Sequence, residues 1–224
     1  GVAFLTLFNL GFYFIANETG LPAEAGPAAN ILRNQVYNFL TNAGLYAVNF
    51  LAIAMGALVS ADTLAGEINT GTIQSLVTKP VRRAEVVLGK WLGFAGLIAL
   101  YLILMVGGVV GSVYFIYGYA VPNVPAGMAL MYLESLLIMT LTLACSSMLS
   151  TLATGGTMFG LYGIAFIGGW VEQIGAVLQN QTAMNIGVVT SLIIPSEALF
   201  RRAAYEMTSV TVRALGISFG PLFV

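Results

Sequence analysis

The segment Asp62–Lys90, DTLAGEINTGTIQSLVTKPVRRAEVVLGK, is a polar island between two long apolar stretches. It holds four of the eight basic residues of the chain and three of the nine acidic residues. Charge gathered between two membrane spans indicates a segment that stays in water on one side of the membrane. A turn would need far fewer residues, and this segment contains two helix breakers, Gly71 and Pro80. We therefore expect a small docking element here.

The composition is that of an integral membrane protein. The 224 residues are 58% hydrophobic and 8% charged, whereas a soluble domain has about 25% charged residues. A net charge of −1 argues against a nucleic-acid partner. The chain has no histidine and one cysteine, Cys145, so a Cys/His zinc site is excluded, and we predict neither a metal site nor catalytic residues.

Apolar run lengths predict an all-α fold, a polytopic transmembrane helical bundle. A spanning helix needs about 20 mostly apolar residues. The stretches that approach this length predict spans at about 1–16, 38–60, 91–117, 128–149 and 155–171. Both chain ends fall inside apolar runs, so we expect a single transmembrane domain over 1–224 that is truncated at both ends.

The distribution of Lys and Arg predicts the orientation. By the positive-inside rule the loop 61–90 is cytoplasmic, whereas the connection 17–37, whose one basic residue is Arg33, and the connection 118–127, which has none, lie outside. Parity then makes 172–224 an outer loop. Its basic residues conflict with the rule, so either 186–194 and its neighbours cross the membrane or the loop contains re-entrant or interfacial helices; we favour the second interpretation. The basic residues concerned are Arg201, Arg202 and Arg213.

Within the spans, small residues and one acid stand out. Glycine pairs four residues apart predict close helix packing, inside the bundle or at a subunit interface; they are Gly89 and Gly93, Gly107 and Gly111, and Gly156 and Gly160. Glu134 is a candidate intramembrane polar residue, with an interfacial carboxylate near the outer headgroups as the alternative. Glu172 closes the fifth span and is interpreted as a boundary residue.

The island itself is predicted to contain two short helical pieces. Residues 61–69 continue the second span into the cytoplasm, and Gly71 is a natural stop for that helix. Thr72 can cap a second helix, with apolar residues on one face, that Pro80 ends. This second helix would lie roughly parallel to the membrane. The residues that form its apolar face are Ile73, Leu76 and Val77, and the expected interfacial anchors that follow are Lys90 and Trp91.

These residues resemble the signature of ABC-2 type permeases, the membrane subunits of one class of ATP-binding-cassette exporter. The resemblance is carried by Glu67-x-x-x-Gly71-Thr72-Ile73-Gln74, by Leu76-Val77-Thr78-x-Pro80-Val81-x-Arg83 and by Leu88-Gly89-Lys90. Arg82 departs from the small hydroxyl residue of many relatives. The segment 191–199, SLIIPSEAL, is similar to the outer loop of the branch near the nitrous-oxide-reductase maturation permease.

The resemblance implies six spans, so that five are visible here, and a coupling helix between spans 2 and 3. It also implies a second permease copy or paralogue, an ATPase subunit that carries ATP and Mg²⁺, and a place in the plasma or inner membrane. This chain would then need no cofactor of its own. The residues implied to contact the ATPase are Glu67, Gly71, Thr72, Ile73, Gln74, Leu76, Val77, Pro80 and Arg83.

Two other classes of function remain open at this point. An ATP-independent membrane channel or scaffold would need a polar lining, and few polar residues are evident in the spans at helical spacing. An intramembrane enzyme would need clustered catalytic groups, which Glu134 alone does not supply. Gly89-Lys90 lacks the first glycine and the following Ser or Thr of a phosphate loop. Nothing in the sequence chooses the cargo.

Overall fold

The computed structural model describes residues 1–18, 26–69, 83–193 and 195–209. Within these ranges the chain is helical and contains no strand, which confirms the predicted all-α class. The helices are α1 (Val2–Glu18), α2 (Gly26–Asn69), α4 (Arg83–Tyr117), α5 (Val124–Ser146), α6 (Thr151–Val177), α7 (Gln181–Ile193) and α8 (Ser196–Met207).

Four of these helices are long and apolar enough to cross a membrane. Their apolar stretches run over Asn30–Thr63, Ala84–Tyr117, Val124–Ser146 and Thr151–Ala176. Helix α1 has a shorter apolar stretch, Val2–Ile15. Each predicted span falls on one of α1, α2, α4, α5 and α6, and most of these helices extend beyond the predicted ends. Helix α6, for example, continues past Val171 to Val177.

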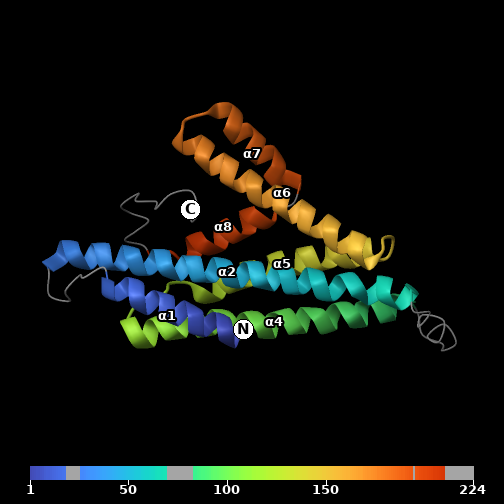
Figure 1. The fold of residues 1–224 in the computed structure, drawn as a ribbon, viewed down its shortest axis with the longest axis horizontal. Helices are drawn as coiled ribbons and strands as arrows, with labels where there is room; N and C mark the ends of the chain where they lie inside the picture. Colours follow the sequence, from blue (N-terminus) through green and yellow to red (C-terminus); the bar gives the residue numbers. More distant parts are fainter. Residues whose placement is uncertain (19–25, 70–82, 194, 210–224) are drawn as a thin grey trace.

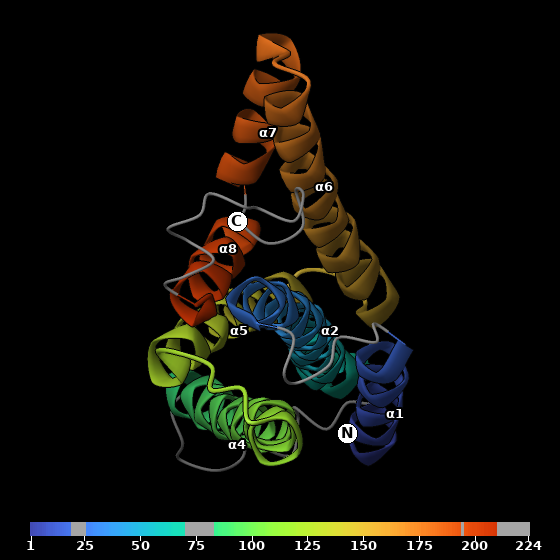
Figure 2. The same cartoon turned by 90° about the vertical axis from the view of Figure 1, so that its left-hand side faces the viewer.

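The centre of the bundle is the long helix α2. It runs alongside α1, α4 and α5, whose axes are roughly aligned with its own (Figure 1). Seen from the end, α2 lies between α1 on one side and α5 on the other, with α4 beneath (Figure 2). The main apolar core joins buried side chains of α2, α4, α5 and α8; examples are Leu45, Leu102, Met139 and Phe200.

Helix α2 has a buried seam in which polar residues recur. Gln35, Asn42 and Asn49 lie seven residues apart, and all three are buried. A repeat of seven keeps residues on one face of a helix that packs along a neighbour. Leu45 and Ala52 continue the same face with apolar side chains. The interior of this membrane bundle is therefore partly polar along α2.

Helices α6 and α7 form a hairpin that leans away from the other helices (Figures 1 and 2). The two helices approach closely at Gly175, where an added Cβ atom would lie 2.9 Å from the backbone nitrogen of Met184. With 13 residues, α7 is too short to cross a membrane, which needs about 20. Helix α8 then returns to α5, where Met207 covers Gly127.

The glycine pairs singled out in the sequence face away from the other helices in the part of the chain that the structure describes. A Cβ atom added at any of them would meet nothing within 4 Å in the described structure: Gly89, Gly93, Gly107, Gly111, Gly156 and Gly160. Among the described residues, these six positions therefore do not show the expected packing inside the bundle. The close approaches occur at other glycines, such as Gly44 beside Phe8 and Gly108 beside Leu5.

We predict that Gly175→Val destabilises the protein by about 1–3 kcal/mol, because the new side chain would press on the Met184 backbone, which cannot move aside. Gly160→Val on the same helix is the matched control, since it points into open space. Thermal unfolding of both variants in detergent tests this. Equal unfolding temperatures for the two variants would contradict the described contact between α6 and α7.

Candidate functional site

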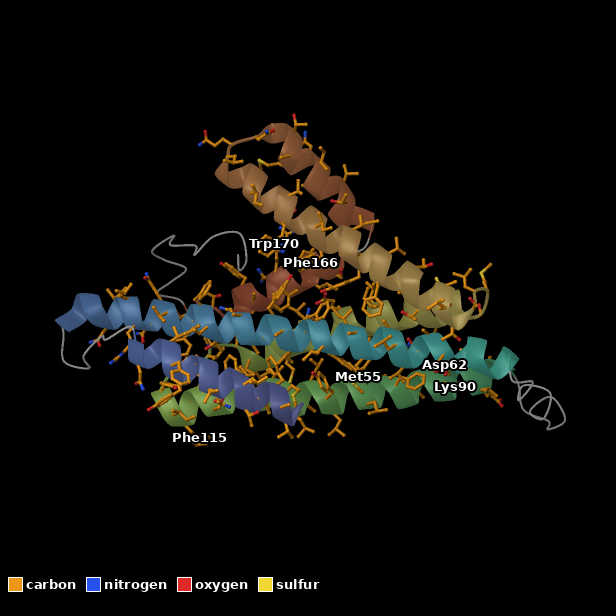
Figure 3. The ribbon with its side chains drawn as sticks, in the orientation of Figure 1. Met55, Asp62, Lys90, Phe115, Phe166 and Trp170 are labelled. Carbon is orange, nitrogen blue, oxygen red and sulfur yellow. The ribbon has the colours of Figure 1, made fainter. Side chains whose placement is uncertain are left out.

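The polar island joins two helices at one end of the bundle. Helix α2 ends at Asn69 and α4 begins at Arg83, and Figure 3 shows Asp62 and Lys90 near this end. The predicted helical continuation of span 2 over 61–69 is confirmed. The predicted coupling helix lies outside the described residues, as do Gly71, Thr72, Ile73, Gln74, Leu76, Val77 and Pro80. Glu67 and Arg83 lie within α2 and α4, but their side chains are not described.

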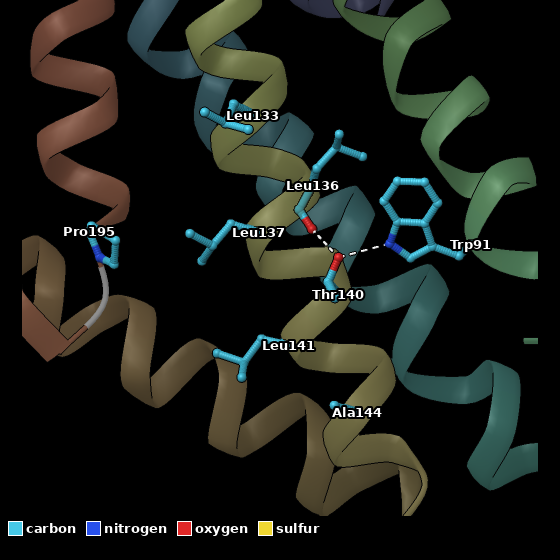
Figure 4. Close-up of a pocket in the computed structure, with 8 residues that line it drawn as sticks. All are labelled: Trp91, Leu133, Leu136, Leu137, Thr140, Leu141, Ala144 and Pro195. Atoms are coloured by element: carbon cyan, nitrogen blue, oxygen red, sulfur yellow. Dashed lines mark hydrogen bonds between the residues drawn. The ribbon is translucent and has the colours of Figure 1, made fainter. Parts of the chain in front are cut away.

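Lys90 and Trp91, predicted as interfacial anchors, link helices to one another in the structure. The Lys90 Nζ atom donates to the backbone oxygen of Thr63 at 3.3 Å, which ties α4 to α2. The Trp91 Nε1 atom donates to Thr140 Oγ1 at 2.8 Å, which ties α4 to α5 (Figure 4). The Thr140 hydroxyl in turn donates to the Leu136 backbone oxygen at 2.7 Å. The start of α4 is thus fastened to two neighbours.

Asp62 provides a further link that the sequence analysis did not single out. Its Oδ1 atom accepts a hydrogen bond from Thr151 Oγ1 at 3.1 Å, and Thr151 is the first residue of α6. Ser150 caps the same helix by accepting from the Ala153 backbone nitrogen. Asp62 and Lys90, the first and last residues of the island, and the adjacent Trp91 thus join the ends of α2 and α4 to each other and to α5 and α6.

Glu134 lies in the interior of the bundle, not at its edge. It is 1% exposed, and its Oε2 atom accepts a hydrogen bond from Asn49 Nδ2 at 2.9 Å. The carboxylate is therefore enclosed between helices of the bundle and bonded across α2 and α5. The sequence analysis missed Asn49. The signal that would have revealed it is the seven-residue recurrence of Gln35, Asn42 and Asn49 in an otherwise apolar span.

A second set of hydrogen-bonded polar side chains lies at the end of the bundle opposite the polar island. The Tyr119 hydroxyl donates to Asn38 Oδ1 at 3.1 Å, and Asn42 Nδ2 donates to the same oxygen at 3.3 Å. Tyr119 lies in the turn between α4 and α5, where burial raises the pKa of its phenol and a hydrogen bond with Ser209 opposes that shift. The turn is therefore fixed on α2 by side-chain hydrogen bonds.

Two arginines of the predicted outer segment are paired with acids. Arg201 Nη2 lies 2.9 Å from Glu172 Oε2, which connects α8 to α6. Arg202 Nη2 lies 2.6 Å from Glu206 Oε1 within α8. Glu172, interpreted from the sequence as a boundary residue, is thus part of a contact between two helices. Arg213 lies outside the described residues.

Glu197 occupies a buried position at the start of α8, which is outside the four candidate spans. Burial raises the pKa of its carboxyl to about 7. The positive charge of Arg201 lowers this pKa and the negative charge of Glu172 raises it, but desolvation has the largest effect. An added Cβ atom at Gly169 would meet the Glu197 side chain, so α6 covers this carboxyl closely.

The surface grooves are apolar. One, of about 730 Å³, follows α5 (Figure 4) and is lined by Trp91, Leu133, Leu136, Leu137, Thr140, Leu141, Ala144 and Pro195. Another, of about 390 Å³, lies between α2 and α6 and is lined largely by aromatic side chains. In the ranges that the structure describes, no three His, Cys, Asp or Glu residues are grouped to hold a metal ion. These surfaces carry no group that would define a polar cargo.

The raised pKa of Glu197 predicts a pH-dependent stability. The folded protein holds this proton up to about pH 7, whereas the unfolded chain releases it near pH 4.5, so the free energy of unfolding falls as the pH rises through this window, by about 3 kcal/mol. Glu197→Gln should remove this part of the slope, measured as unfolding temperature against pH. Glu85→Gln, an exposed carboxyl on α4, is the control. An unchanged slope in Glu197→Gln would contradict the assignment.

Comparison with known proteins agrees with the helical layout and the polar island. A family model described as "ABC-2 family transporter protein" matches residues 2–215, nearly the whole chain. No curated protein matches the chain. No solved structure matches it either. The match covers α1 to α8 together with the island. The chain therefore belongs to the ABC-2 family of transporter proteins and is a multi-pass membrane permease of an ABC transporter.

Proposed function

We propose that this permease couples ATP hydrolysis by a separate ATPase subunit to export across the membrane, and that the loop 61–90 is the cytoplasmic contact. ATP and Mg²⁺ would be bound by the ATPase, and this chain would supply no catalytic residue. The observation that carries the proposal is the set of interhelical bonds at the flanks of the island. They join the ends of α2 and α4 to α5 and α6.

These bonds would let a push on the loop reach the membrane. Residues 62 and 63 lie on α2 at the start of the island, and residues 90 and 91 lie on α4 at its end. Each of the two helices continues from there through the length of a span, and a helix transmits displacement along its axis as a rigid element. Movement of the loop would therefore move α2 and α4 together and pull on the start of α6 through Thr151. A transport cycle needs a contact that differs between two states, and the ATPase contact would supply it.

We further propose that the permease works with a second copy or a paralogue, each a single transmembrane domain. Support comes from the glycine pairs of α4 and α6, which face open space in the protomer. In lipid, small residues on an uncovered helix face allow another helix backbone to approach. Because no described residue of the protomer packs on these glycines, a helix of a neighbouring subunit is the partner that we propose for them.

Coupling is tested with the double variant Glu67→Ala, Gly71→Pro in the full-length permease. We expect the ATPase subunit to co-purify with the wild type in mild detergent, and co-purification and ATP-driven transport to fall at least tenfold in the variant. The control is Glu85→Ala, which removes a carboxylate from the same island outside the motif residues. Normal co-purification and transport in the double variant would overturn the contact role of this loop.

The subunit interface is tested by cysteine cross-linking in a Cys145→Ala background. Cysteines placed singly at the six outward-facing glycines should give cross-linked dimers at one of the three pairs or more. Gly108→Cys is the matched control, because its side chain would point at Leu5 inside the protomer. If none of the six positions cross-links, or if Gly108→Cys does so equally well, these glycines do not lie at an interface between copies.

A further inference from the structure

We propose that Glu134 and Asn49 form a proton-binding site in the interior of the bundle, in which a protonated carboxyl and a carboxamide are joined by two hydrogen bonds. The ligand of this site is a single proton, held on the Glu134 Oε1 atom. The proton makes the pair a neutral clamp between α2 and α5. The inference goes beyond the transport role, since it concerns two residues remote from the loop 61–90.

One of the two hydrogen bonds is present in the structure. Asn49 Nδ2 donates to Glu134 Oε2 at 2.9 Å, across the contact between α2 and α5. Both side chains are 1% exposed, so bulk water does not reach them. An amide and a carboxyl group each have two polar atoms on a planar end, and one atom of each is used in this bond.

The second half follows from the two atoms that have no partner. Glu134 Oε1 and Asn49 Oδ1 are both buried without a hydrogen bond. Both are oxygen acceptors when the carboxyl is ionised, and a buried acceptor without a donor costs about 1–3 kcal/mol. A proton on Oε1 turns this atom into a donor, and Asn49 Oδ1 is the free acceptor of the residue already bonded to Glu134. One proton therefore satisfies both atoms.

The surroundings favour the neutral form. In the ranges that the structure describes, the ionisable groups that interact with Glu134 are Glu197 on α8, Tyr46 on α2 and Tyr162 on α6. Each of these is neutral or negative, so none supplies a positive charge to balance a carboxylate. A buried carboxylate without such a partner is expensive, and neutralisation by a proton is the usual outcome.

The Glu134→Gln variant distinguishes this arrangement from an ordinary buried charge. A glutamine side chain has the shape of a protonated glutamate, and its Nε2 atom would donate to Asn49 Oδ1 while its oxygen accepts from Asn49 Nδ2. We expect its unfolding temperature to match that of the wild type. Glu134→Leu and Asn49→Leu should each lower the unfolding temperature by about 5 °C or more, since each substitution leaves the other buried polar side chain without its hydrogen-bond partner. The double Leu variant should recover part of this loss.

Infrared spectroscopy of the full-length permease in lipid vesicles at neutral pH detects the proton directly. The difference between wild type and Glu134→Gln should contain the carbonyl band of a carboxylic acid. Glu85→Gln, an exposed carboxyl, is the control and should remove carboxylate bands instead. Loss of carboxylate bands in Glu134→Gln would overturn the proposal. So would stabilisation of the wild type, but not of Glu134→Gln, by Na⁺ or K⁺, since a metal cation would then occupy the site.

Discussion

The hydrogen bonds that satisfy buried polar groups of α2 are the constraint on which the arrangement of the bundle depends. In lipid there is no water to accept or donate, so each polar side chain must meet a partner on another helix or on its own backbone. Asn38 meets Tyr119 and Asn49 meets Glu134, and both contacts are buried, whereas Asp62, an exposed residue of the polar island, meets Thr151 at the end of α2. These contacts, spread along one helix, fix the turn after α4, the middle of α5 and the start of α6 relative to α2.

The large features of the fold were open to prediction because they depend on composition and on the length of apolar runs. Spans, the polar island and the helical continuation over 61–69 follow from such local patterns. The side on which a helix packs does not follow from a local pattern. The pairs Gly107–Gly111 and Gly156–Gly160 have the spacing of helix contacts, but spacing alone does not say where a partner lies, and no described residue of the protomer packs on them.

The candidate site shows the same difference between features that a local sequence pattern predicts and features that depend on how the helices pack. Lys90 and Trp91 were recognised from their place at a span boundary, but their partners, Thr63 and Thr140, lie 27 and 49 residues away in the chain. Glu134 was recognised as an acid within a span, and its burial depends on α2, 85 residues earlier. Asn49 carries no charge and was overlooked. Neutral amides in an apolar span are as informative as acids when they recur on one helix face.

The unequal lengths of the helices bear on how the protein sits in membranes of different thickness. Helix α2 has 44 residues, roughly 66 Å, and exceeds any bilayer, whereas α5 has 23 residues, roughly 35 Å, close to the hydrocarbon thickness. Because α2 is longer than the bilayer at any of these thicknesses, the helix whose length would match or mismatch the bilayer thickness is α5. Lipid composition would thus act on α5, and through Trp91 on the start of α4, while leaving the fit of α2 unchanged.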